Sequence, residues 1–275
     1  MSALEDARTG DSPHPLSRVE SPTISVVIPT LNEASNLPHV LTRIPDIVDE
    51  VVLVDGHSVD DTITVAKMIR PDIRVVLQTD IGKGNALACG FAAASGQIIV
   101  SIDADGSNDP AEIPQFVEAL LAGSDFAKGS RFTPGGDSLD ITPLRARGNR
   151  ALGIVVNTLF RTRYTDLCYG YNAFWRHCLP HMQVTCAGFE VETLINVRVA
   201  RAGLSVAEVP SVEHQRLNGE SNLHAVRDGL RILRAILGER FSRRRVPADP
   251  DAWRPSFDEL GAPAGRAQLC LASDE

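Results

Sequence analysis

The sequence predicts an α/β fold with a central, mostly parallel sheet flanked by helices. From Ile24 onward, short runs rich in β-branched residues alternate with stretches of helical periodicity, as in chains that form a parallel sheet with crossover helices. These runs are almost continuously apolar, which is typical of strands buried on both faces. With 275 residues, of which 43% are hydrophobic, the chain can bury a large core.

The amino-terminal half carries the clearest alternation. Strands are predicted at residues 24–28, 50–54, 73–77 and 97–102. Helices are predicted to begin near Glu33, Asp60, Lys83 and Pro110. Proline suits a helix entry because its missing N–H has no helical partner there. Asp60 and Asp61 are expected to cap the helix that follows them.

After Lys128 the alternation loosens, and glycines after Pro134 predict a loop. The remaining predicted elements are a helix at 144–160, a strand at 169–175, a helix at 189–202, a last strand at 205–209 and an amphipathic helix at 222–241. The ends, 1–21 and 242–275, are rich in Pro, Asp, Glu and Arg and are expected to be flexible tails. One domain is therefore predicted over 22–241.

Composition excludes several classes of protein. A net charge of -8 and a pI near 5.4 argue against a general nucleic-acid binder. The five cysteines are odd in number and form no C-x-x-C pair, which argues against structural zinc and favours a reducing compartment. The first 21 residues contain no apolar segment typical of a secretory signal, and no stretch approaches the ~20 apolar residues of a membrane span. A cytoplasmic protein is expected.

The most informative motif is Asp103-Ala104-Asp105, at the end of a predicted buried strand. Ligands bind beyond the carboxyl ends of strands in open α/β sheets, and two carboxylates there suit Mg²⁺ or Mn²⁺ bridging a diphosphate. An EF-hand is excluded because Asn108 and Pro114 stand where its loop needs Gly and Glu. A solvated turn that caps the next helix is the alternative.

Polar residues also follow the first two strands. Pro29 to Glu33 end the first, and Asp55 ends the second, where its carboxylate can accept from ring N–H or ribose hydroxyl groups. Lys83 lies in a Gly-Lys-Gly turn that opens a helix, which favours an anion, although an ordinary surface lysine fits as well. Neither a phosphate-binding P-loop nor a dinucleotide-binding glycine motif is present.

Taken in order, these motifs resemble family 2 glycosyltransferases of the GT-A fold. The resemblance rests on the end of the first strand, Asp55 with Ser58 and Asp61, the Gly82-Lys83-Gly84 turn, Asp103-Ala104-Asp105, and Gly129-Ser130-Arg131, and it covers about residues 24–237. It is strongest to dolichyl-phosphate mannose synthases and polyprenyl-phosphate sugar transferases. It implies an inverting transfer of a hexose from a UDP- or GDP-sugar.

The resemblance also implies roles for single residues. Pro29, Glu33 and Asp55 would hold the nucleotide with Lys83 nearby, and Asp103 and Asp105 would bind the metal ion, Mg²⁺ or Mn²⁺, and the diphosphate.

Two further positions belong to the same predicted site. Arg131 and Asp166 would contribute to binding the nucleotide sugar, with Asp166 at the sugar hydroxyls. Tyr169 or Tyr171 would stack on a sugar ring or pack in the core. Ser107 stands where this branch often has glutamine.

The acceptor is predicted from two residues. Arg216 precedes the last helix, as in the lipid-phosphate branch, and can grip phosphate oxygens, although Asn222 replaces that branch's usual lysine. Glu192, favoured over Glu190, resembles the general base of family members that glycosylate hydroxyl groups. Both glutamates also suit a helix N-terminus on electrostatic grounds alone. His214 is expected to be structural.

The resemblance favours a polyprenyl-phosphate acceptor, because the stretch from Arg216 to Leu223 matches the lipid-phosphate branch over more positions than the spacing of Glu192 matches the other branch. A glycan or small-molecule hydroxyl acceptor, with Glu192 as base, is the alternative. A sugar nucleotidyltransferase would need a glycine-rich basic loop after the first strand, which is absent, and a binding module with a dead site would not need the aspartate pair. The last helix alternates apolar residues with arginines, which suits either peripheral membrane contact or docking on the core.

Overall fold

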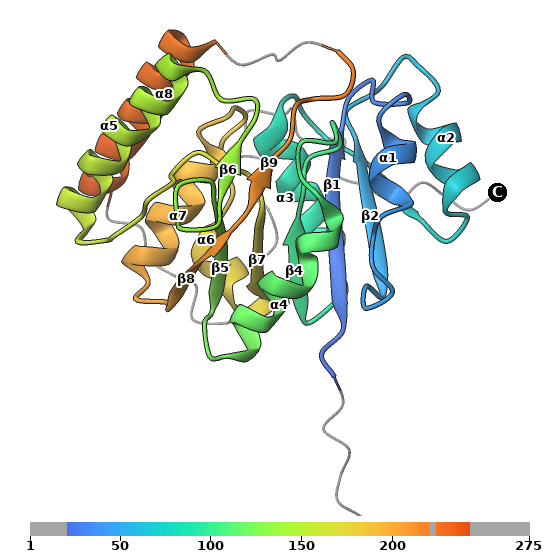
Figure 1. Ribbon diagram of the computed structural model, residues 1–275, viewed down its shortest axis with the longest axis horizontal. Helices are drawn as coiled ribbons and strands as arrows, with labels where there is room; N and C mark the ends of the chain where they lie inside the picture. Colours follow the sequence, from blue (N-terminus) through green and yellow to red (C-terminus); the bar gives the residue numbers. More distant parts are fainter. Residues whose placement is uncertain (1–20, 220–223, 243–275) are drawn as a thin grey trace, which may run out of the picture.

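A seven-stranded mixed sheet forms the centre of the molecule (Figure 1). The structure, a computed structural model, describes residues 21–219 and 224–242. The strand order is β3-β2-β1-β4-β7-β5-β8. The strands are β1 (Ile24–Thr30), β2 (Glu50–Asp55), β3 (Arg74–Leu77), β4 (Ile98–Ser101), β5 (Phe126–Ser130), β7 (Asn172–Trp175) and β8 (Val206–Pro210).

The sheet is mostly parallel, as predicted. The pairs β1–β2, β2–β3, β1–β4 and β5–β8 are parallel, and β7 runs antiparallel between β4 and β5. The register sets Thr30 opposite Asp55, so these two strands end level with each other. Because the chain leaves β1, β2, β4 and β5 at one edge, the polar motifs that follow them meet there.

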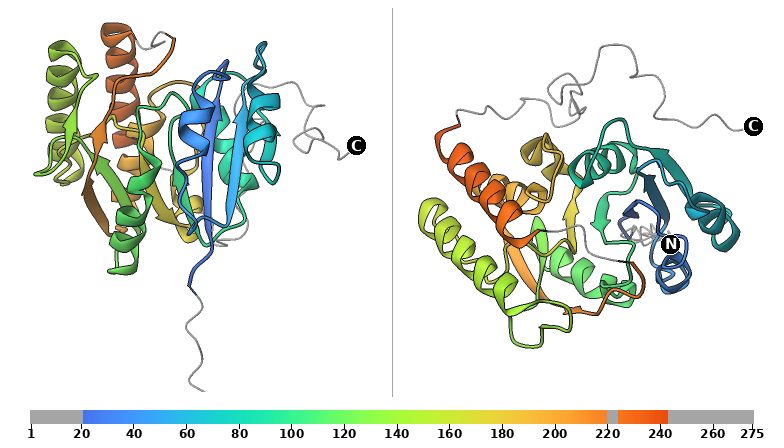
Figure 2. Two further views of the ribbon diagram at one scale, coloured as in Figure 1. Left: turned by 45° about the vertical axis from the view of Figure 1, so that its right-hand side comes forward. Right: turned by 90° about the horizontal axis from the view of Figure 1, so that it is seen from above.

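Helices cover both faces of the sheet (Figure 2). One face packs on α1 (Leu37–Leu41), α2 (Thr62–Ile69) and α4 (Ile113–Leu121), the last entered through a 3₁₀ turn at Pro110–Glu112. The other face packs on α3 (Lys83–Ala93), α6 (Leu179–Met182) and α7 (Val191–Arg201). The nearly continuous apolar strands follow from this double coverage.

Two long helices form a further layer outside α7. These are α5 (Pro143–Phe160) and α8 (Ala225–Phe241), which lie side by side in both figures. Val156 of α5, Val197 of α7, and Ile232 and Ile236 of α8 share one small apolar cluster. Thr142 caps α5 by accepting from the Arg145 N–H.

The structure corrects the predicted elements at several places. The strand predicted at 169–175 begins only at Asn172, and α6 was not predicted. The helix expected near Glu33 begins only at Leu37, after a turn in which the Glu33 carbonyl accepts from Asn36 and Leu37. Strand β5 was not predicted, because its sequence, Phe-Ala-Lys-Gly-Ser, has no continuous apolar run. Strand β8 is not the last, since β9 (Val212–Glu213) pairs with β6 (Asp137–Ser138).

The two predicted caps of α2 differ. Asp60 accepts from the Thr62 N–H, whereas the Asp61 side chain makes no cap hydrogen bond. The tails predicted at 1–21 and 242–275 lie almost wholly outside the described residues.

Candidate active site

Two pockets meet at the edge of the sheet where the parallel strands end. The large pocket, of about 680 Å³, lies beyond β1, β2 and the start of α3, and its lining includes Pro29, Glu33, Gly56 and His57. The small pocket, of about 330 Å³, lies beyond β5, and its lining includes Arg131, Tyr169, Gly170 and Arg216. Both are lined by Lys83, Asp103, Asp105 and Phe189. Two ligands can therefore approach each other at the aspartate pair.

Lys83 joins the two pockets through a pair of carboxylates. Its Nζ lies 2.7 Å from Asp103 Oδ1 and 2.7 Å from Glu192 Oε1. Burial alone would lower the pKa of Lys83, but the two carboxylates outweigh it and the pKa is raised, so the lysine stays charged. One ammonium serves two carboxylates, and burial raises the pKa of Glu192 despite its contact with Lys83. The sequence alternative of an ordinary surface lysine is wrong.

Gly170 leaves room for this cluster. A Cβ atom built there would lie 3.0 Å from Lys83 Nζ and 3.3 Å from Asp103 Oδ2. The backbone before β7 thus approaches the charged groups closely, as only glycine permits without displacing them.

Arg216 forms a second bridge, between Asp105 and Glu33. Its Nη2 lies 2.8 Å from Asp105 Oδ2, and its Nη1 lies 3.2 Å from Glu33 Oε1. Burial raises the pKa of Glu33, against the opposing effects of Asn36 and Arg216. The predicted residues Glu33, Asp105 and Arg216 are therefore brought together.

The segment that carries Arg216 is fixed by its backbone. His214 N–H donates to the Ser107 carbonyl at 2.9 Å, and Leu217 N–H donates to the Asp105 carbonyl at 3.2 Å. Asn218 donates to the Asn36 side chain at 2.8 Å. Residues 214–219 thus run across the Asp105 turn and hold the guanidinium over it. Asn222 lies outside the described residues.

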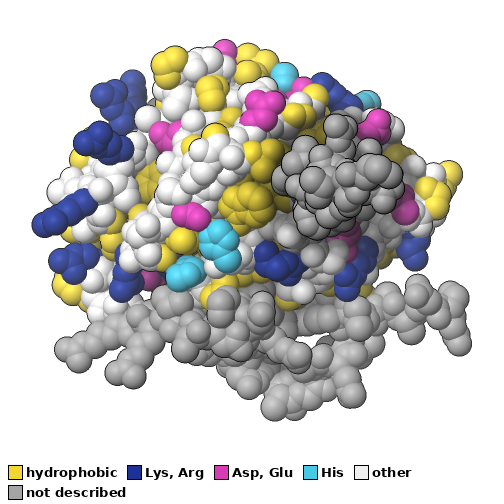
Figure 3. All heavy atoms as spheres, turned by 90° about the horizontal axis from the view of Figure 1, so that it is seen from below, with side chains coloured by type: hydrophobic (Ala, Val, Ile, Leu, Met, Phe, Trp, Pro, Cys, Tyr) yellow, Lys and Arg dark blue, Asp and Glu magenta, His cyan; other side chains and the backbone are white. Residues whose placement is uncertain are grey.

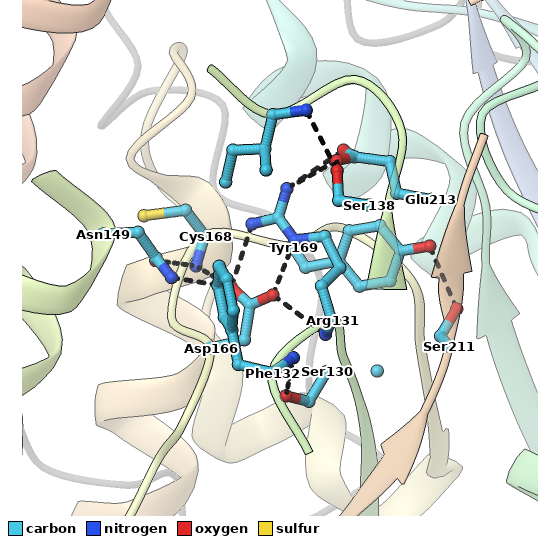
Figure 4. A network of polar contacts seen from close by, with 12 residues as sticks. Ser130, Arg131, Phe132, Ser138, Asn149, Asp166, Cys168, Tyr169, Ser211 and Glu213 are labelled. Carbon is cyan, nitrogen blue, oxygen red and sulfur yellow. Dashed lines mark hydrogen bonds and ion pairs between the residues drawn. The ribbon is translucent and has the colours of Figure 1, made fainter. Parts of the chain in front are cut away.

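A buried network beside the small pocket centres on Arg131 (Figure 4). Arg131 Nε lies 2.7 Å from Asp166 Oδ2, and its Nη1 lies 3.0 Å from Glu213. Asn149 of α5 donates to Asp166 at 3.1 Å. The Arg131 guanidinium also lies 4.9 Å from the centre of the Tyr169 ring. Sequence reasoning missed Glu213 and Asn149, which are isolated polar residues with no motif around them.

Arg131 and Tyr169 line the small pocket, but Asp166 does not. The Asp166 side chain is fully buried, and although burial opposes it, Arg131 lowers the pKa of this carboxyl. Tyr171 also belongs to the core, where its ring stacks on Phe116 at 4.2 Å. Asp166 is therefore an ion-pair partner that fixes the position of Arg131. Contact between Asp166 and a sugar is still only predicted.

Asp55 lies at the end of β2 behind the lining of the large pocket. Among the described residues, that lining includes Gly56, His57 and Gln78 but not Asp55. Both Asp55 carboxylate oxygens accept hydrogen bonds from Ser58. The backbone N–H donates to Oδ2 at 2.9 Å, and the hydroxyl donates to Oδ1 at 2.6 Å. Asp55 therefore shapes the turn that carries His57, and its direct contact with a nucleotide is still only predicted.

The start of α3 is less open to an anion than the sequence predicted. Gly84 N–H donates to the Ala187 carbonyl at 3.1 Å. A Cβ atom at Gly82 would lie 2.1 Å from that same oxygen, so both glycines allow the backbone of residues 186–188 to press against the helix. The Lys83 side chain supplies the cation in this region.

Cys168 borders the small pocket without being a reactive thiolate. Burial raises its pKa to about 12, so it stays protonated at neutral pH. Covalent catalysis by this thiol is not supported.

The aspartate pair has the donor chemistry for a divalent ion. No group of three or more His, Cys, Asp or Glu side chains within the described ranges forms a complete metal site. Mg²⁺ and Mn²⁺ in transferases commonly use one or two carboxylates, with substrate phosphates as further ligands. Asp103 and Asp105 fit this pattern, and each now faces a cationic side chain.

Comparison with known proteins decides the family. The model of "Glycosyl transferase family 2" matches residues 25–197. The chain belongs to glycosyltransferase family 2. The matched region contains Lys83, the aspartate pair and Glu192, whereas Arg216 lies beyond it. The predicted family and enzyme class are confirmed.

Two curated glycosyltransferases are similar to this chain over most of its length. The chain is 30% identical over 218 residues to glycosyltransferase AglJ of Haloferax volcanii, covering 75% of this chain and 68% of that protein. It is 31% identical over 214 residues to the undecaprenyl-phosphate mannosyltransferase of Micrococcus luteus, covering 73% and 87%.

A solved structure of another sugar transferase shares the fold. Glucosyl-3-phosphoglycerate synthase of Mycobacterium tuberculosis, in complex with Mn²⁺, UDP-glucose and glycerol 3-phosphate, superposes with a TM-score of 0.64 and 28% identity over 80% of each chain. The glycosyltransferase described here is thus GT-A-like, as predicted. None of its described helices has the length and apolar character needed to cross a bilayer.

Proposed function

We propose that this glycosyltransferase moves a hexose from a UDP- or GDP-sugar to a polyprenyl phosphate, with inversion and with a divalent metal ion. The large pocket would take the nucleotide, because it has room for a nucleotide sugar and lies beyond the ends of β1 and β2. The small pocket would take the acceptor phosphate. The anomeric carbon would then lie between them, near the aspartate pair.

Asp103 and Asp105 would hold Mg²⁺ or Mn²⁺, which would supply positive charge to the donor diphosphate. Arg216 would leave its ion pairs with Asp105 and Glu33 and bind phosphate oxygens instead, which a guanidinium can do in a bidentate manner. Lys83 would stay charged beside the developing diphosphate. Arg131 would be a fixed cation at the acceptor side, because Asp166 and Glu213 hold it in place.

The observation that carries the acceptor proposal is the set of cations around the small pocket. Four cations line it, Lys83, Arg131, Arg145 and Arg216. In the absence of ligand they are paired with the carboxylates of the same lining, Asp103, Asp105, Asp140, Glu192 and Glu213, which an acceptor phosphate would have to replace in part. An acceptor phosphate is already ionised, so it needs cations to bind it and no base to deprotonate it. The naming of several relatives at about 30% identity as polyprenyl-phosphate mannosyltransferases supports the same acceptor.

A hydroxyl acceptor is the second candidate, and Glu192 favours it. Its carboxylate lines the small pocket, and burial raises its pKa towards the range that suits a general base. The ion pair with Lys83 opposes this role, since a base must accept a proton while its neighbour remains positive.

Turnover of two variants separates the candidates. With a polyprenyl phosphate as acceptor, Arg216→Ala should lower turnover roughly 10- to 150-fold, the equivalent of one charge-assisted hydrogen bond. Glu192→Gln should change it far less than the ~10²- to 10⁴-fold expected for loss of a base. Matched controls are Glu190→Gln, which lines neither pocket, and Arg43→Ala on the surface. Loss of activity in Glu192→Gln with near-normal Arg216→Ala would establish the hydroxyl acceptor instead.

The proposed setting is the cytoplasmic side of a membrane. The cysteines that the structure describes, Cys89, Cys168, Cys178 and Cys186, are free thiols, which supports a reducing compartment as the setting.

A further inference from the structure

The outer surface of α5 and α8 carries charge of one sign. We define the basic wall as residues 143–163 and 224–242, which lie side by side at the left of Figure 1. Its exposed charged side chains are Arg147, Arg150, Arg161, Arg163, Arg227, Arg231, Arg234 and Arg240. Its carboxylates, Asp228 and Glu239, are both buried. Figure 3, seen from below, shows Lys and Arg side chains gathered along the left edge, on the side of these helices.

This distribution is opposite to that of the whole chain, whose net charge is -8. Glu239 forms ion pairs with Arg198 at 2.7 Å and Arg201 at 2.9 Å, both on α7. Its negative charge therefore does not offset the exposed arginines of the wall. Arg227 and Arg231 lie 4.0 Å from Asp228 and Glu190, respectively. Even so, the exposed arginines outnumber these carboxylates, and the basic wall presents net positive charge to its surroundings, a local feature that the composition conceals.

Apolar side chains lie between these arginines. On α8, Val226, Leu230, Leu237 and Phe241 are 68%, 51%, 44% and 80% exposed. Their spacing of four, seven and four residues places them in one stripe along the helix. On α5, Leu144 and Ile154 are each 60% exposed.

The other face of α8 provides its docking surface. Ile232 and Ile236 are buried there against α5 and α7. Two sequence alternatives, docking on the core or contact with a membrane, thus belong to different faces of one helix. Leu223, four residues before Arg227, lies outside the described residues.

We infer that the basic wall binds the surface of an anionic lipid bilayer. Exposed arginines attract anionic headgroups, and apolar side chains between them enter the boundary of the acyl region. A twofold dimer through this wall would set arginines against arginines, which disfavours a second copy as the occupant. A nucleic acid would use the arginines but leave the apolar stripe in water.

The basic wall also adjoins both pockets. Arg227 and Arg231 line the large pocket, and Ile232 lines the small one. This inference deepens the proposed function and rests on it for its purpose, because a polyprenyl phosphate resides in a bilayer. The membrane inference, however, is argued only from the charge and exposure of the basic wall. It and the proposed function can therefore fail separately.

Sedimentation of the full chain with vesicles tests the inference without any substrate. Phosphatidylcholine vesicles with 30% phosphatidylglycerol are compared with pure phosphatidylcholine, at low and high salt. We expect binding to the anionic vesicles that weakens with salt. The double variant Arg150→Glu and Arg234→Glu should lower the partition coefficient at least tenfold, and Ile154→Ser with Leu230→Ser should also lower it. None of these four residues lines either pocket.

A matched control lies on the opposite side of the molecule. Lys67→Glu with Met68→Ser changes an exposed basic and an exposed apolar residue of α2 and should leave binding unchanged. The inference is overturned if wild type ignores anionic vesicles, if the control variant loses as much binding as the wall variants, or if the wall variants instead abolish a dimer or nucleic-acid binding. Turnover then separates the two proposals. Arg150→Glu with Arg234→Glu should slow transfer to a vesicle-embedded polyprenyl phosphate and spare transfer to a short-chain, water-soluble one.

Discussion

Two cationic side chains at this site, Lys83 and Arg216, each form ion pairs with two carboxylates. Lys83 contacts Asp103 and Glu192, and Arg216 contacts Asp105 and Glu33. Both aspartates of the pair are therefore neutralised before any ligand arrives. If the aspartates hold the proposed divalent ion, that ion would compete with Lys83 and Arg216, and the two cations would then be free to contact the donor phosphates.

This arrangement predicts that Asp105→Asn loses metal-dependent donor binding while keeping its fold. Asp105 lies in a turn after β4, outside the core clusters, so its replacement should leave unfolding of the free protein little changed. Thermal shift with UDP- and GDP-sugars is the measurement, because a ligand selective for the native state raises the unfolding temperature. In wild type the Mn²⁺-dependent part of the shift should vanish with EDTA.

The matched variant Asp61→Asn, at an exposed position whose side chain makes no cap hydrogen bond, should behave as wild type. A full Mn²⁺-dependent shift in Asp105→Asn would contradict the metal assignment.

At the scale of elements, α8 has one face buried against the core and one face exposed to its surroundings. Ile232 and Ile236 face the core, whereas Leu230 and Leu237 face outward. Burial of an apolar side chain stabilises the fold in proportion to the area removed from water, so neighbouring positions on this helix should differ sharply in their effect on stability.

We expect Ile236→Ala to lower the free energy of unfolding by about 2–5 kcal/mol, because it leaves a cavity between α5, α7 and α8. Leu237→Ala, at the next position and 44% exposed, should lower it by less than about 1 kcal/mol. Denaturant unfolding of both variants gives the comparison. Equal effects would mean that the helix is docked through a different face.

Elements with a local signature were predictable from the sequence. The strands β1, β2 and β4 are continuous apolar runs, and the motifs after them converge because parallel strands end at one edge. Strand β5 depends instead on its neighbours, since Lys128 is fully buried and donates to the Tyr169 carbonyl at 3.0 Å. No local pattern marks a buried lysine as a strand residue. The partners of Arg131 lie 35 and 82 residues away, so their contact with it could not be read from spacing.

At the scale of the whole molecule, the Arg131 network fastens the outer helices to the sheet. Arg131 follows β5, Asp166 precedes β7, Glu213 belongs to β9 and Asn149 belongs to α5. These four segments meet at one buried guanidinium. Loss of a single partner should therefore affect global stability as well as the small pocket.

We expect Asp166→Asn to destabilise the protein by about 3–5 kcal/mol at pH 7, because it leaves Arg131 buried with one carboxylate fewer. Although burial opposes it, Arg131 holds the pKa of Asp166 below its ordinary value, so this contribution is present above about pH 4 and is lost as the pH falls through the lowered pKa. The free energies of unfolding of wild type and Asp166→Asn should therefore become equal only at a pH below the lowered pKa of Asp166.

Denaturant unfolding as a function of pH provides the measurement, with Asp137→Asn as an exposed control that should match wild type throughout. A constant difference between wild type and Asp166→Asn down to the lowest accessible pH would contradict the ionised pair.

The position of Lys83 also links the two pockets thermodynamically. Its ammonium is shared between a carboxylate after β4 and a carboxylate on α7. A ligand in the large pocket that draws Asp103 towards itself changes the electrostatic environment of Glu192 in the small pocket. Linkage of this kind is reciprocal, so the factor by which donor alters acceptor affinity equals the factor by which acceptor alters donor affinity. In the proposed reaction, the coupling between donor and acceptor affinity would therefore pass through the charge of one nitrogen atom.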